Sequence, residues 1–285
     1  MEFVPYEFCD AVAEISRDIS AIDGVFAARC WQRAIHKEAV NRSILSIYIG
    51  FIKGAWTCNL WNYRTSKQMS LKEFREADKQ NYRIEFISME SGLHISGKSS
   101  TLQEIKELAE CTLPYVNRAI VSLQSWQGAE VPQQAREILS IYERSSITKT
   151  TLHGDSKLHE EFLMEQMKAG SLKFIEFKKE NSLSSDLQRA LEEFALENSF
   201  GRIDVYSNET IFGRTFAFIL LIRCRGGIFV GKFDFQMDDA QNIPNKAQFK
   251  QNSRCATWIR DDGVKVKITN GSRLVKNQFT MEFAV

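Results

Sequence analysis

The residue types that carry most enzyme chemistry occur in this sequence, but not at the spacing of a known catalytic or metal-binding motif. The four histidines are His36, His94, His153 and His159, and none of them forms a His-Glu-x-x-His zinc motif. His153 and His159 flank a Gly-Asp turn, so we expect solvated loop histidines rather than a metal pair. The sequence also lacks Gly-x-Ser-x-Gly, P-loop and Gly-x-Gly-x-x-Gly motifs. We therefore expect a protein that is not an enzyme and that needs no cofactor or metal.

One basic cluster has the composition of a nucleic-acid site. Arg223, Arg225 and Lys232 lie close together in sequence, and Phe229 and Phe233 offer rings on which bases would stack. The chain as a whole has 37 basic and 36 acidic residues, a net charge of +1, whereas nucleic-acid-binding domains are typically strongly basic. We favour a solvated sheet face for these residues and expect no nucleic-acid partner.

The composition is that of an ordinary globular protein. The 285 residues are 44% apolar and 26% charged. No apolar run reaches the 18 residues of a transmembrane helix, and residues 1–7 lack the basic start and apolar stretch of a signal peptide. The six cysteines are widely spaced, so we expect reduced thiols. These features favour a cytoplasmic or nuclear protein with no membrane partner.

From residue 44 onward the sequence alternates between strand-like and helix-like segments. Residues 44–63 predict a hairpin whose turn is Lys53-Gly54. Further along, Leu172–Phe177 predicts a strand and Ser184–Glu197 an amphipathic helix. Strand-like segments begin near residues 119, 147, 172 and 202, which is a period of about 25 to 30 residues, within the range of β/α repeats.

This period predicts an α/β fold built as a degenerate, leucine-rich-repeat-like β/α solenoid. A doubly wound α/β sheet has the same pattern, but the similar lengths of the units favour the solenoid. Residues 228–285 are strand-rich, with a hairpin turn at Asp261-Asp262-Gly263, and predict a β-rich C-terminal cap. The predicted organisation is a helical segment over 1–43, the hairpin and repeat region over 44–227, and the cap over 228–285.

The N-terminal segment predicts two helices. Pro5 lies near the start of the first, where its missing N–H costs nothing. Phe8, Val12 and Ile15 recur at helical spacing after it. The second helix is expected from about residue 24 to residue 41.

These residues resemble an F-box, which begins with Leu-Pro-x-Glu-Leu/Ile and closes near Val-x-Lys/Arg-x-Trp-Arg-x-Leu. The matching positions hold Pro5, Glu7, Phe8, Val12, Ile15, Arg29, Trp31 and Ile35. The whole chain is similar to the large nematode family of divergent F-box proteins, in which a short N-terminal F-box precedes an F-box-associated or repeat region. It departs from the motif at 16–21, where the usual Leu-Pro-x-x-Asp-Leu is missing, and at Ala27, where valine is usual.

The resemblance implies a substrate-recognition subunit of a cullin–RING (SCF-type) ubiquitin ligase. The N-terminal helices are then expected to bind a Skp-type adaptor, and the repeat surface an unknown target protein. The expected adaptor-binding residues are Pro5, Phe8, Val12, Ile15 and Trp31. One alternative is a non-ligase interaction scaffold with the same fold. Another is that residues 1–43 form a helical cap of the solenoid, with Pro5 and Trp31 as packing residues.

Overall fold

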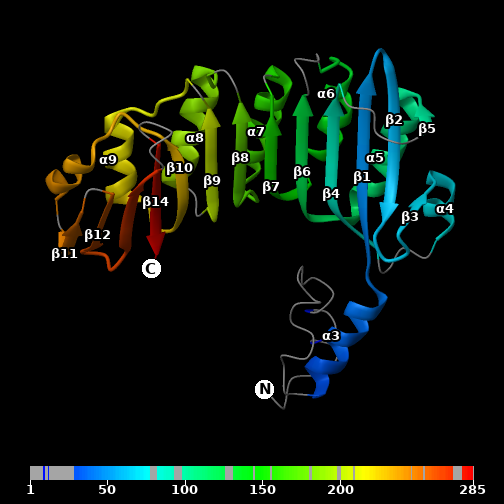
Figure 1. Ribbon diagram of the computed structural model, residues 1–285. Helices are drawn as coiled ribbons and strands as arrows, with labels where there is room; N and C mark the ends of the chain where they lie inside the picture. The colour runs from blue at the N-terminus through cyan, green and yellow to red at the C-terminus, as the bar shows by residue number, and fades with distance from the viewer. Residues whose placement is uncertain are drawn as a thin grey trace.

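The computed structural model describes most of the chain, namely residues 9, 12, 29–77, 82–92, 98–125, 131–143, 145–154, 156–179, 182–197, 200–207, 209–244, 246–252, 254–271 and 278–284. Within these ranges the chain has a mixed α/β fold, in which one large open sheet of 14 strands carries helices along one face (Figure 1). Every helix in the same ranges is too short or too polar to span a lipid bilayer.

The centre of the sheet is a run of parallel strands that lie side by side in chain order. They are β1 (Ser43–Ile52), β4 (Tyr82–Ser91), β6 (Val116–Ser125), β7 (Ser146–His153), β8 (Phe174–Lys179), β9 (Arg202–Ser207) and β10 (Gly227–Lys232). The strands predicted near residues 147, 172 and 202 are therefore neighbours in one parallel sheet, as the repeat pattern required.

A row of helices covers one face of these strands, behind the sheet in the view of Figure 1. They are α5 (Leu102–Thr112), α6 (Ala135–Tyr142), α7 (Lys157–Ala169), α8 (Ser185–Glu197) and α9 (Arg214–Arg223), with neighbours in contact in chain order. Local signals set the ends of these helices. Thr101 and Glu104 form a capping box before α5, and Gly170, at φ 77°, ends α7 in the left-handed conformation.

The core lies between the sheet and this row of helices. Alternate residues of each strand point into it, as Ile175 and Phe177 of β8 do, while the residues between them point to the other face. The helices contribute apolar stripes, such as Leu187 and Leu191 of α8, which are fully buried. Burial of each such side chain contributes about 1.5–3 kcal/mol, so this layer supplies most of the stability.

The predicted hairpin forms the N-terminal end of the sheet. β1 pairs antiparallel with β2 (Ala55–Asn62) through a turn at Lys53 and Gly54, which have φ angles of 49° and 83°. Short strands β3 (Lys67–Met69) and β5 (Lys98–Ser100) pair with the far side of β2, and helix α4 (Leu71–Glu76) follows β3. Such short edge strands leave little unpaired backbone for edge-to-edge association.

The other end of the sheet is antiparallel and matches the strand-rich C-terminal segment. Beyond β10 come β14 (Gln278–Ala284), β13 (Lys265–Asn270), β12 (Cys255–Arg260) and β11 (Lys246–Gln251). Short 3-10 helices η1 (Leu113–Tyr115) and η2 (Met237–Asn242) complete the described elements. The expected boundary between 227 and 228 falls at the start of β10, and the sheet continues through it without a break.

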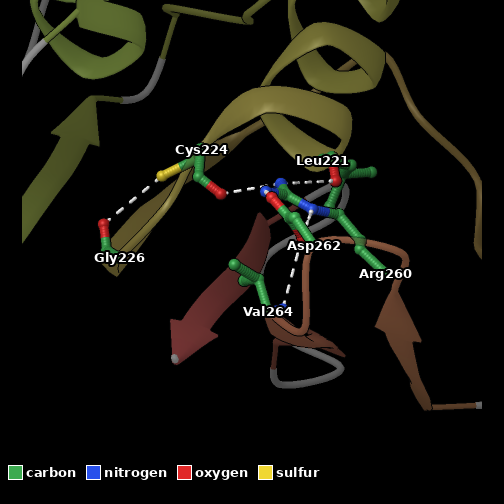
Figure 2. Close-up of polar contacts among 6 residues, drawn as sticks. All are labelled: Leu221, Cys224, Gly226, Arg260, Asp262 and Val264. Atoms are coloured by element: carbon green, nitrogen blue, oxygen red, sulfur yellow. Dashed lines mark hydrogen bonds and ion pairs between the residues drawn. The ribbon is translucent and has the colours of Figure 1, made fainter.

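Arg260 joins this C-terminal end to the helix row (Figure 2). Its side chain is only 7% exposed and donates from Nη1 to the carbonyls of Cys224, at 2.7 Å, and Leu221, at 3.4 Å. These are carbonyls at the C-terminus of α9, where a cation interacts favourably with the helix dipole. Asp262 accepts from Nε of the same guanidinium at 3.0 Å, and the charged partner lowers the pKa of Asp262 to about 2.

The described N-terminal helix is α3 (Arg29–Asn41), which leads into β1 (Figure 1). It confirms the second predicted helix from residue 29 onward. Ala34 and Ile35 are buried, whereas Gln32 and Arg33, which precede them on the helix, are exposed. The first predicted helix lies outside the described residues, apart from positions 9 and 12, which are helical.

Candidate protein-binding face

The sheet face opposite the helices carries a regular array of polar and aromatic side chains on β7, β8 and β9. Strand register aligns these residues in three rows, which we call the charged grid. The rows are Lys149, Phe174 and Arg202; then Thr151, Glu176 and Asp204; and then His153, Lys178 and Tyr206. No helix of the described chain crosses this face (Figure 1). The grid therefore lies on a face that no described helix covers.

The carboxylates occupy the middle row, and each is paired with cations from the outer rows. Glu176 lies 3.3 Å from Lys149 Nζ on β7 and 2.8 Å from Lys178 Nζ on its own strand. Asp204 accepts from Arg202 Nε with both oxygens, at 2.9 and 2.8 Å. Each of the two strands thus holds a recessed carboxylate that is paired with longer cationic side chains, two at Glu176 and one at Asp204.

These pairs shift the ionisation of the groups that form them. Hydrogen bonding to Lys178 and then to Lys149 lowers the pKa of Glu176, and the same contact raises the pKa of Lys178. The Asp204 carboxylate raises the pKa of Arg202. In contrast to Lys178 and Arg202, His153 has a lowered pKa, because burial and then the nearby Lys178 charge disfavour its protonated form. At neutral pH the imidazole is therefore uncharged, and the grid holds three cations and two anions.

Two grid positions are exposed aromatic side chains. Phe174 is 42% exposed and Tyr206 is 39% exposed, although most large apolar side chains among the described residues are buried. The Phe174 ring packs over Gly201, where a side chain would clash, because a Cβ at that position would lie 2.8 Å from two ring carbons. Exposed aromatic residues and arginine are among the residue types that protein interfaces favour.

The histidines differ from the sequence expectation. His159 lies on α7 and is only 2% exposed, and His153 is half-buried at the end of β7, so the prediction of solvated loop histidines was wrong. Helices α6 and α8 contact α7 on its two sides, and they cover residues such as His159 that flank its apolar stripe. No group of three or more His, Cys, Asp or Glu side chains is placed to hold a metal ion within the described ranges.

The basic cluster near the C-terminus cannot work by stacking bases on its two phenylalanines. Phe229 and Phe233 are completely buried and pack against each other, with ring centroids 5.6 Å apart. Arg223 and Arg225 are exposed, but at the C-terminal end of α9 rather than beside those rings. The favoured interpretation, a solvated sheet face, is therefore wrong for these two phenylalanines, because period-2 alternation cannot show which face of a strand is covered.

The expected adaptor-binding residues are only partly within the described chain. Trp31 lies on α3 and Val12 lies in a helical position, and both side chains are half-buried. Pro5, Phe8 and Ile15 lie outside the described residues. Of the five residues, the described structure therefore places only Val12 and Trp31.

Sequence reasoning missed the charged grid. The available signal was a repeat of polar positions on successive strands, Phe174-x-Glu176-x-Lys178 and Arg202-x-Asp204-x-Tyr206. Both triplets have an acid in the centre and a cation and a ring at the two ends. Because cross-strand register is not encoded in either segment alone, only the structure shows that the two acids are neighbours.

Comparisons with known proteins do not identify this chain. No protein-family profile, curated protein or solved structure matches it.

Proposed function

We propose that this protein is a recognition subunit that binds a target protein through the charged grid and the surrounding open sheet face. The observation that carries the proposal is the pair of exposed rings, Phe174 and Tyr206, set among ion-paired residues on a face that no described helix covers. Aromatic and arginine side chains contribute most of the binding energy at protein interfaces. Rigid strands hold these side chains in fixed register, which favours a specific partner.

We further propose that the sheet and its helix row form a degenerate, leucine-rich-repeat-like β/α solenoid. The support is the chain-order arrangement of parallel strands with helices on one side in the described residues. A doubly wound sheet would place helices on both faces. In a one-sided array the uncovered strand face is left available for binding partners.

The target-binding unit is proposed to act within an SCF-type cullin–RING ubiquitin ligase, with the N-terminal helices bound to a Skp-type adaptor. The support for this step is the F-box-like sequence from Pro5 to Ile35 and the helical conformation of α3. In this role the chain performs no chemistry itself. A non-ligase scaffold that uses the same sheet face is the second candidate, and it differs only in the absence of adaptor binding.

The test is affinity capture by the full chain from a cell extract, with quantification of every captured protein. Phe174→Ser is compared with Ile222→Ser, because the Ile222 side chain is also 42% exposed but lies on helix α9. We expect the adaptor to be captured by both variants and other partners to be lost only with Phe174→Ser. Capture of all partners without dependence on Phe174 would contradict recognition through the open face. Absence of the adaptor from every capture would favour the scaffold.

A further inference from the structure

The charged grid presents its cations to solvent and keeps its carboxylates beneath them. The side chains of Lys178 and Arg202 are 53% and 45% exposed, whereas those of Glu176 and Asp204 are 21% and 12% exposed. The acidic side chains are shorter and lie in the middle row, so the longer basic side chains reach over them, Lys149 and Lys178 over Glu176 and Arg202 over Asp204. A partner that approaches this face therefore meets ammonium and guanidinium groups first.

These cations keep hydrogen-bonding capacity for a partner. An ammonium group has three N–H donors and a guanidinium has five. In the described structure Lys149 and Lys178 each contact the Glu176 carboxylate, and Arg202 donates from Nε to the Asp204 carboxylate. Donors thus remain on each cation, and the carboxylates below fix the positions of the charged groups.

We propose that the target binds the charged grid through an extended acidic segment that also carries an apolar side chain. This inference rests on the proposed function and names the chemistry of its partner. Three cations over two carboxylates give the grid a charge of +1 while His153 is neutral. A basic segment would find both acids recessed and already paired. The apolar side chain packs on the exposed ring of Phe174.

The spacing of the first row suggests the spacing of the acidic residues. Lys149, Phe174 and Arg202 lie on three neighbouring strands, so the two cations are about 10 Å apart at the usual strand separation of roughly 4.8 Å. An extended chain advances about 3.3 Å per residue and its side chains alternate between two faces, so residues four apart share a face and span about 13 Å. The long Lys149 and Arg202 side chains can reach outward over the remaining distance. The segment is therefore expected to hold an acid-x-apolar-x-acid pattern, with the central apolar residue on the same face, over Phe174.

The carboxylates also argue against a nucleic acid on this surface. Single-stranded nucleic acid uses a continuous basic groove with aromatic stacking, and affinity depends on the number of phosphates neutralised. Here Glu176 and Asp204 lie between the cations, so a continuous phosphate backbone would place charges over both carboxylates, whereas a peptide needs acidic residues only over the cations. An oligonucleotide is therefore included in the test as a competing ligand.

The experiment selects a random 12-residue peptide library, displayed on phage, on the full chain. Selected peptides are then titrated by fluorescence polarisation against the unmodified protein and three variants, one of which is Phe174→Ser. Lys149→Gln removes a grid cation while Glu176 keeps Lys178. Lys106→Gln is the matched control, since Lys106 is similarly exposed and pairs with Glu137 at 2.9 Å, but on the helix side. A twelve-nucleotide oligo-dT is titrated in parallel.

We expect selection of acid-x-apolar-x-acid peptides that bind Lys149→Gln about fivefold more weakly and bind Lys106→Gln unchanged. Neutral or basic peptides that lose affinity in Phe174→Ser would overturn the acidic partner and leave recognition by this face intact. Failure to select any peptide that depends on the grid would overturn both. Tighter binding of oligo-dT than of the peptides would also overturn the inference, and thermal melting confirms that each variant is folded.

Discussion

Replacement of Arg260 by methionine tests how the antiparallel end of the sheet is held to the helix row. Methionine keeps an unbranched apolar stem but removes the guanidinium, so the carbonyls of Leu221 and Cys224 lose their donor (Figure 2). Both residues are at most 2% exposed, so water cannot readily replace the lost bonds. A buried polar group left unsatisfied costs about 1–3 kcal/mol. The Cys224 bond, at 2.7 Å, is the stronger of the two, and we expect a loss of about 2–4 kcal/mol in the free energy of unfolding.

Urea unfolding followed by far-ultraviolet circular dichroism measures this loss. Asp262→Asn is the control, because it removes the ion pair but leaves Arg260 to cap the helix, so its destabilisation is expected to be much smaller. Arg260→Lys keeps the charge without the forked donor geometry and is expected to fall between the two. If Arg260→Met were within about 0.5 kcal/mol of the unmodified protein, the side chain would not be a structural cap of α9.

Three further predictions concern stability. Gly227→Ala is expected to lower the free energy of unfolding by about 2–4 kcal/mol, because Gly227 has φ 102° and a Cβ there would lie 2.4 Å from the Phe200 carbonyl oxygen. The control in the same urea titration is Gly213→Ala, where a Cβ meets nothing within 4 Å. Phe74→Ala is expected to cost about 3–5 kcal/mol, because the ring is fully buried, and a melting curve within a few degrees of the unmodified protein would contradict this. His153 has a lowered pKa in the folded state, so the unfolded chain binds more protons and stability falls as pH drops below the ordinary value of 6.5. Between pH 7.5 and pH 5.5 the melting temperature is expected to fall less for His153→Gln than for the unmodified protein. An equal fall would exclude this histidine as a cause.

The strand order in the centre of the sheet was predictable because its signals are local. The tight turn at Lys53-Gly54 needs positive φ, which glycine adopts readily, and this turn joins β1 to β2 as expected. The similar length of successive strand–helix units also predicted that the strands beginning near 147, 172 and 202 are neighbours. Helix α9 was less clear from its residues, because the segment 216–222 is apolar throughout and would suit a strand as well.

The binding face was not predictable, because it depends on register and on which face the helices cover. Glu176 and Asp204 become neighbours only through the pairing of β8 with β9. Burial of polar residues on α7 was missed for a related reason. Periodicity locates one apolar stripe, but contacts with α6 and α8 also cover His159 and Gln166 at its sides, and the Gln166 amide donates to the Glu143 carbonyl at 3.0 Å.

Calorimetric titration of the full chain with a purified Skp-type adaptor is the most direct test of the recognition-subunit account. A complex at micromolar concentration or below is predicted, and the Pro5→Ala, Phe8→Ala double variant is expected to bind at least tenfold more weakly, because a buried interface anchor contributes about 2 kcal/mol or more. The double variant must melt like the unmodified protein. A large fall in melting temperature would instead show that these residues pack within the fold. Absence of any complex at micromolar concentration would contradict the ligase role.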